Sequence, residues 1–138
     1  MTTVVATGVF SILHPGHIVF LEEAKKLGDK LVVIVATDST VKKSKGINLI
    51  PEEQRLQVIS ALKMVDEAVL GDEKDRFKRI IEIKPDIIAI GKDQEHDAEE
   101  IEEELKKRGL KTRVVEIDKY WESDLNSSKK IVEKIRKL

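Results

Sequence analysis

Two of the three histidines in this chain stand three positions apart, in the segment His14-Pro15-Gly16-His17. The segment follows a short apolar run over residues 4–10 and precedes a helix-like pattern that opens at Ile18. At the end of a strand, glycine lets the backbone approach a phosphate, the start of a helix offers unpaired N–H groups, and two imidazoles add donors that can carry charge. The spacing therefore indicates a phosphate site. The structural alternative is a turn with one capping and one half-buried histidine.

The bulk composition fits one soluble domain over residues 1–138. With 25 basic and 26 acidic side chains, the chain has no field of one sign that would hold a nucleic-acid backbone or an anionic membrane. It has no cysteine, its first residues lack the basic start and apolar core of an export signal, and no apolar run reaches membrane-spanning length. These features predict a cytoplasmic protein with neither nucleic acid nor membrane as a partner.

Short β-branched runs alternate with longer amphipathic stretches, which is typical of parallel strands joined by crossover helices. We therefore expect an α/β fold, a Rossmann-like three-layer sandwich with a five-stranded parallel sheet flanked by helices. The near-continuous apolar runs predict central strands, buried on both faces. The expected strands are Thr3–Thr7, Lys30–Ala36, Glu67–Leu70, Asp86–Ile90 and Thr112–Glu116. The expected helices are His17–Leu27, Pro51–Leu62, Asp75–Glu82, Ala98–Arg108 and Ser127–Arg136.

Small or polar residues follow three of the expected strands. The first strand leads into Gly8-Val9-Phe10 and the histidine segment, the second into Thr37-Asp38-Ser39, and the fourth into Gly91-Lys92-Asp93-Gln94. In an open parallel sheet, ligands bind beyond the carboxyl ends of the strands, near the point where the strand order reverses. We expect these three segments to meet there.

The segment from Thr7 to His17 resembles the first motif of the nucleotidyltransferase superfamily, which carries an HxGH element. Residues 28–38, 51–55 and 64–66 resemble its cytidylyltransferase-like branch, so the resemblance covers nearly the whole chain. That branch includes glycerol-3-phosphate cytidylyltransferases and archaeal FAD synthases. Residues 50–55 and 91–94 look closer to the FAD synthases.

The resemblance implies nucleotidyl transfer, in which a substrate phosphate attacks the α-phosphorus of a nucleoside triphosphate and pyrophosphate leaves. The implied substrates are ATP and FMN, and the implied metal is Mg²⁺ or another divalent cation held mainly through the triphosphate rather than by a protein site. A cytidylyltransferase that uses CTP and a polyol phosphate such as glycerol 3-phosphate is one alternative. A nucleotide-binding module without turnover is another. Pairing into a homodimer is a further expectation.

The resemblance also implies roles for five side chains in the reaction. His14 and His17 would donate hydrogen bonds to phosphate oxygens rather than act as nucleophiles. Lys42 and Lys45, in a turn-rich stretch after the second strand, would close over the phosphates, with a solvated lysine run as the plain alternative. Arg55 would offer a planar fork to the leaving pyrophosphate.

A further set of residues is expected to bind the nucleotide. Glycines would keep the loop close to the phosphates, Phe10 would wall the pocket, Asp93 would meet the base or ribose, and the serines would cap the last helix as well as bind phosphate. The whole set is Gly8, Val9, Phe10, His14, Pro15, Gly16, His17, Asp93, Tyr120, Ser127 and Ser128.

Two departures complicate the resemblance, and three further residues have open alternatives. Ser11 stands where the family usually has an aspartate, and the segment before the last helix lacks the arginine typical of the glycerol-phosphate enzymes. Tyr120 and Trp121 in that segment would stack on a flat ring, adenine or isoalloxazine, or else pack at the rim or against a second copy. His96 lies among carboxylates, but no second histidine falls at helical ligand spacing, so we expect no protein metal site there.

Overall fold

The computed structural model describes residues 1–91 and 98–138. Within them, five strands form one fully parallel sheet in the order β3-β2-β1-β4-β5. This confirms the expected α/β architecture with a five-stranded parallel sheet. The strands are β1 (Thr3–Gly8), β2 (Lys30–Val35), β3 (Glu67–Leu70), β4 (Ile87–Gly91) and β5 (Arg113–Ile117).

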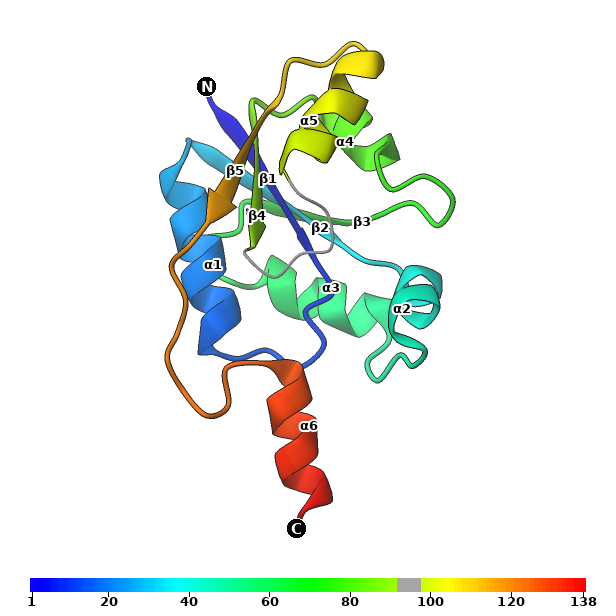
Figure 1. Cartoon of the computed structure of the whole chain (residues 1–138). Helices are drawn as coiled ribbons and strands as arrows, with labels where there is room; N and C mark the ends of the chain where they lie inside the picture. Colours follow the sequence, from blue (N-terminus) through cyan, green and yellow to red (C-terminus); the bar gives the residue numbers. More distant parts are fainter. Residues whose placement is uncertain (92–97) are drawn as a thin grey trace.

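Helices cover both faces of the sheet (Figure 1). Side chains at alternate strand positions point to opposite faces. Val4, Ala6 and Leu31 therefore join one core with Leu21 of α1 (Pro15–Lys26) and Ile59 of α3 (Glu52–Ser60). Val5 and Val32 join a second core with residues of α4 (Lys78–Ile83) and α5 (Ala98–Lys107). The described helices are α1 (Pro15–Lys26), α2 (Asp38–Lys45), α3 (Glu52–Ser60), α4 (Lys78–Ile83), α5 (Ala98–Lys107) and α6 (Ser128–Arg136).

Apart from shifts of up to three residues in the bounds of the elements, the fold differs from the sequence-based expectations in two places. Residues 38–45, which the sequence analysis placed in a turn-rich stretch, form helix α2. This helix buries only Val41, so it has too little apolar periodicity to be recognised. In addition, β3 and β5 lie at the edges of the sheet, although their apolar runs predicted central strands.

The chain runs outward from β1 through β2 to β3 and then returns to β4 on the other side of β1. The strand order therefore reverses between β1 and β4, where open parallel sheets bind their ligands. Helix α1 begins beyond the carboxyl end of β1, and α6 extends away from this end of the sheet to the C-terminus (Figure 1). None of the helices in the described ranges is long and apolar enough to span a bilayer.

Candidate functional site

The two histidines of the motif cap the first helix with their own side chains. His14 is the N-cap residue of α1, and its Nδ1 accepts a hydrogen bond from the Gly16 backbone N–H at 3.1 Å. His17 Nδ1 accepts from the His14 backbone N–H at 3.2 Å, which completes a reciprocal capping box. The two rings lie with their centroids 3.9 Å apart. Both imidazoles are therefore held in place by the backbone of the motif itself.

These bonds fix the tautomer of each neutral ring. A nitrogen that accepts a hydrogen bond carries no proton, so the proton of each neutral imidazole lies on Nε2 and can be donated. Burial lowers the pKa of His14, and it lowers the pKa of His17 to about 4, with the nearby His14 and Lys45 charges adding to the effect. The pair is therefore neutral near pH 7 and offers two N–H donors rather than two positive charges.

Phe10 packs the second histidine from the side. Its ring meets the His17 ring edge-on, with centroids 5.4 Å apart, and its backbone has a φ of +53°, which an L-residue rarely adopts. A Cβ added to Gly8 would lie 2.7 Å from the tip of the Phe10 ring. The glycine at the end of β1 therefore makes room for the ring that shields His17 from water.

The ring of His14 packs so closely against Gly16 that only glycine fits at this position. A Cβ at this position would lie 2.7 and 2.8 Å from the Cε1 and Nδ1 atoms of the His14 ring, and 3.4 Å from the Asn126 carbonyl oxygen. The close approach brings the segment before α6 beside the start of α1. Pro15 fills the first turn of α1, where its missing N–H costs nothing.

The start of α6 is joined to the same loop. Ser127 caps the helix by accepting from the Lys130 N–H at 3.1 Å, which confirms its expected capping role. The Ser128 hydroxyl instead pairs with the backbone of Ile12, accepting from its N–H at 3.3 Å and donating to its carbonyl at 3.1 Å. Two helix N-termini thus meet at the motif, and their positive dipole ends favour an anion between them.

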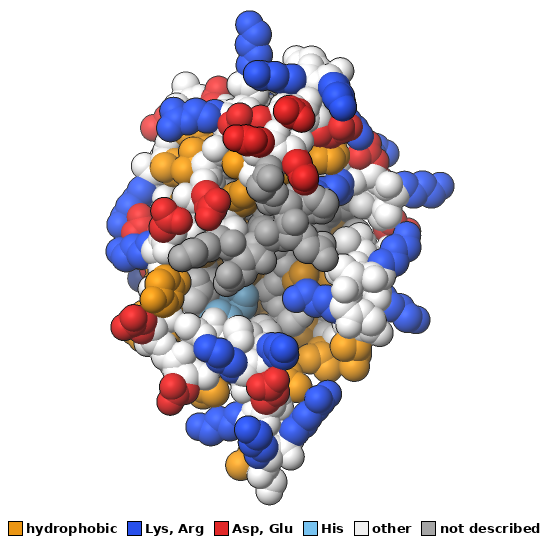
Figure 2. Space-filling model, viewed as in Figure 1, with side chains coloured by type: hydrophobic (Ala, Val, Ile, Leu, Met, Phe, Trp, Pro, Cys, Tyr) orange, Lys and Arg blue, Asp and Glu red, His pale blue; other side chains and the backbone are white. Residues whose placement is uncertain are grey.

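Lysines of α2 lie on the other side of the histidines. Lys42 and Lys45 are exposed in the last turn of this helix, and the charge of Lys45 is close enough to His17 to lower its pKa. In the space-filling view, histidine surface and several Lys or Arg side chains appear on one face (Figure 2). The site therefore combines neutral donors with exposed cations.

Arg55 has a different position from the one expected. Its side chain is fully buried, and its guanidinium donates to the carbonyls of Ile50, Val9 and Ala36 and to the Asp38 carboxylate. Four of its five N–H donors are thus already used. The free fork expected for pyrophosphate is not present in this structure, because the backbone at the ends of β1 and β2 occupies it.

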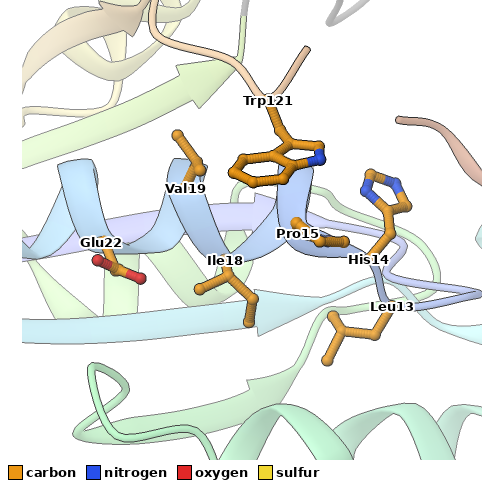
Figure 3. Close-up of a pocket in the computed structure, with 7 residues that line it drawn as sticks. All are labelled: Leu13, His14, Pro15, Ile18, Val19, Glu22 and Trp121. Atoms are coloured by element: carbon orange, nitrogen blue, oxygen red, sulfur yellow. The ribbon is translucent and has the colours of Figure 1, made fainter. Parts of the chain in front are cut away.

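A shallow hollow of about 460 Å³ lies next to His14 on the outer face of α1 (Figure 3). Trp121, from the segment between β5 and α6, lies over Pro15 and Val19, with the ring of His14 at the end of the hollow. Tyr120 does not line the hollow; it is 62% exposed and its hydroxyl donates to Glu122 at 3.4 Å. Of these two aromatic residues, the structure brings Trp121 to the site and leaves Tyr120 in solvent.

Two of the positions considered in the sequence analysis, Asp93 and His96, lie outside the described residues. In the ranges 1–91 and 98–138, no three His, Cys, Asp or Glu side chains are grouped so that they could hold a metal ion.

The sequence matches the cytidylyltransferase-like family over residues 5–134. The chain belongs to this family. Among curated members, it is 61% identical over 135 residues to a protein of Archaeoglobus profundus named FAD synthase, a match that covers 98% of this chain and 86% of that one. It is 59% identical over 135 residues to the FAD synthase of Ferroglobus placidus, with 98% and 88% covered.

A solved structure supports the fold of this cytidylyltransferase-like chain. A Thermoplasma volcanium protein, described as a lipopolysaccharide core biosynthesis protein, superposes with a TM-score of 0.85 at 51% identity, covering 88% of this chain and 99% of that one.

Sequence reasoning did not find every residue that this family member gathers at the site. Asp38 was noted only as a polar residue after a strand, yet it pairs with Arg55 at 3.1 Å. Trp121 was considered only together with Tyr120, because two adjacent aromatic residues give no signal of which one faces a helix. In both cases the missing information is the direction of a side chain outside regular structure.

Proposed function

We propose that this protein is an FAD synthase, which transfers AMP from ATP to the phosphate of FMN and releases pyrophosphate. The reaction class rests on the paired Nε2–H donors of His14 and His17 at the start of α1. The choice of ATP and FMN rests on the near full-length relatives named FAD synthase, at 50–61% identity.

In the proposed reaction, an oxygen of the FMN phosphate forms a bond to the α-phosphorus of ATP, and the bond from that phosphorus to the bridging oxygen of pyrophosphate breaks. No covalent bond to the protein is needed, so catalysis consists of positioning and of stabilising charge. The Nε2–H groups of His14 and His17 would donate to oxygens of the phosphorus that is attacked. Because these donors are fixed before the substrate arrives, they need no reorganisation as negative charge develops.

Groups around the histidines would stabilise the negative charge on the other phosphate oxygens of ATP. The N–H groups in the first turns of α1 and α6 would receive phosphate oxygens, and Lys42 and Lys45 would approach the β- and γ-phosphates from α2. Both lysines are exposed, so they can move to the phosphates without breaking buried contacts. Besides the histidines and lysines, the described part of the proposed nucleotide site consists of Gly8, Val9, Phe10, Pro15, Gly16, Ser127 and Ser128.

Mg²⁺ is proposed to arrive with the triphosphate. The described residues offer amide donors, imidazoles and lysines at the site but no cluster of carboxylates, and this donor set suits phosphate oxygens rather than a metal ion. A bound divalent cation would supply charge neutralisation on the phosphates.

The test is a pyrophosphate-release screen that crosses ATP, CTP, GTP and UTP with FMN, glycerol 3-phosphate, nicotinamide mononucleotide and phosphopantetheine, with chromatography of the products. We expect release with ATP and FMN, together with FAD. Release with CTP and glycerol 3-phosphate would instead make the chain a polyol-phosphate cytidylyltransferase. Tight nucleotide binding without release for any pair would make it a binding module.

A further inference from the structure

Within residues 1–91 and 98–138, Arg55 is the largest fully buried side chain, and it carries a positive charge. Burying a guanidinium without partners is costly, and this one is compensated by three carbonyl oxygens and one carboxylate. These four acceptors come from three segments of the chain, at residue 9, at residues 36–38 and at residue 50. The side chain therefore adds a buried connection between these segments, which are also joined by the bond from the Ala36 N–H to the Gly8 carbonyl and by the bond from the Asp38 N–H to the Glu52 carboxylate, each 2.9 Å long.

The acceptors belong to the two halves of the proposed site. The Val9 carbonyl, at 2.9 Å, lies directly before Phe10, and the Phe10 ring contacts His17. The Ala36 carbonyl, at 2.7 Å, and the Asp38 carboxylate, at 3.1 Å, lie at the start of α2, which carries Lys42 and Lys45. One planar group thus spans the histidine loop and the lysine helix.

We infer that Arg55 is a positioning residue that holds the ring of His17 and the lysine helix α2 in register at the carboxyl ends of β1 and β2. This inference deepens the proposed function, on which its turnover measurements rest. Arg55 acts through Val9 and Asp38 and is not assigned any contact with substrate.

The mechanism follows from the peptide that Arg55 holds. Fixing the Val9 carbonyl fixes the plane of the Val9–Phe10 peptide, and this supports the unusual φ of +53° at Phe10. Once that hold is released, Phe10 can relax, its ring leaves His17, and water reaches the imidazole. Loss of the Asp38 contact lets α2 move, which separates Lys45 from His17.

Lysine cannot replace this arrangement. Its ammonium is a compact charge without the planar fork that reaches acceptors on several sides. Arg55→Lys keeps the charge and most of the volume but gives up part of the four-way contact. Arg79→Lys is the matched control. Arg79 also donates to a strand-end carbonyl, that of Leu70 at 3.0 Å, and it pairs with Glu82 in its own helix.

The experiment measures three quantities on folded protein: kcat for FAD formation, the equilibrium Kd for ATP, and the pKa of His17 by NMR. Among the described residues, the groups that face His17 are His14, Lys45 and the Phe10 ring. For Arg55→Lys we expect kcat to fall about tenfold or more, the Kd for ATP to rise by a smaller factor because Lys42 and Lys45 move with α2, and the pKa of His17 to rise from about 4 toward its ordinary 6.5. Arg79→Lys should leave all three unchanged.

An Arg55→Lys protein that folds, keeps its kcat and keeps the low pKa of His17 would overturn the inference. If that variant does not fold, Asp38→Asn takes its place: a fall in kcat of about threefold or more supports the inference, and an unchanged kcat overturns it. The His17 titration requires no turnover. A protein that makes no FAD but shows the shifted pKa in Arg55→Lys would therefore refute the proposed function and retain the positioning role.

Discussion

The two ends of the sheet use polar residues in opposite ways. At the amino ends of the strands, aspartate carboxylates accept backbone N–H groups of the strand starts: Asp29 from Thr2, Asp86 from Thr3 and Asp66 from Leu31. At the carboxyl ends, His14 and His17 accept backbone N–H groups with one nitrogen each, which leaves the other nitrogen of each ring as a donor. At the amino ends, the aspartates stabilise the fold. At the carboxyl ends, one nitrogen of each histidine ring stabilises the fold and the other can donate to a ligand.

The comparison shows why residue type alone does not identify a functional group. Arg55 lies at the ligand-binding end, yet its bonds resemble those of the aspartates at the far end, because they serve the backbone. His14 has both a structural and a functional part: its Nδ1 caps helix α1, and its Nε2–H remains a donor. After the backbone is satisfied, His14 and His17 each keep an N–H donor at the proposed site, whereas four of the five donors of Arg55 are already used.

The largest expected effect is at the second histidine. His17→Ala removes one of the two fixed donors, so turnover should fall by at least about a hundredfold, the scale seen for a lost transition-state donor. FAD formation measures the effect, and far-UV circular dichroism checks that the fold is intact. Near-normal turnover in the folded variant would remove the catalytic role of this ring.

A smaller loss is expected from the glycine between the histidines. Gly16→Ala places a methyl group against the His14 ring, which must turn away, so kcat should fall about tenfold. Gly71→Ala is the control, because its added Cβ meets its nearest neighbour, the Ile34 side chain, at 3.4 Å. Equal effects of the two substitutions on kcat would contradict the special requirement at Gly16.

At the opposite end, a substitution should change stability but not turnover. The Lys25 ammonium and the Leu31 N–H lower the pKa of Asp66, so its contribution to stability is present above the ordinary value of 3.8 and is lost as pH falls through the folded value. Asp66→Asn should lower Tm by about 2–4 °C at pH 7.

Thermal melts of both Asp66 proteins across pH 2.5–7 test this expectation. The difference in Tm should vanish at the acidic end of the series, and kcat at pH 7 should stay the same. A loss of turnover comparable to that of Gly16→Ala would break the division between the two ends of the sheet.

The smallest effect concerns pH and the neutral state of His17. Since burial lowers its folded pKa to about 4, the ring should stay neutral from pH 8 down to pH 5.5, and its titration should not reduce kcat over that range. Between about 6.5 and about 4, the unfolded chain binds a proton that the folded chain does not, so the free energy of unfolding falls as pH drops.

Stability measured against pH checks the sign of this effect. His17→Gln should flatten the decline in the free energy of unfolding between pH 6.5 and 4.5. A decline as steep as that of the unsubstituted protein would show that His17 is not buried as a neutral ring.

Most of this fold can be predicted from the sequence, because short, near-continuous β-branched runs alternate with longer amphipathic stretches. The carboxyl-end position of His14 and His17 also follows from pattern, since a strand, a glycine and a helix start stand in order. Helix α2 could not be predicted in this way, because Val41 is its one buried residue and the helix has no apolar periodicity. The partners of Arg55 could not be predicted either, since they are carbonyls from segments up to 46 residues away, and backbone carbonyls carry no residue signature.

The most direct test of the account is a crystal structure with a non-hydrolysable ATP analogue that gives the distances from the α-phosphate oxygens to Nε2 of His14 and His17. The account predicts hydrogen bonds of about 2.7–3.2 Å from both rings to phosphate oxygens. A triphosphate bound with neither ring within reach of its oxygens would contradict it.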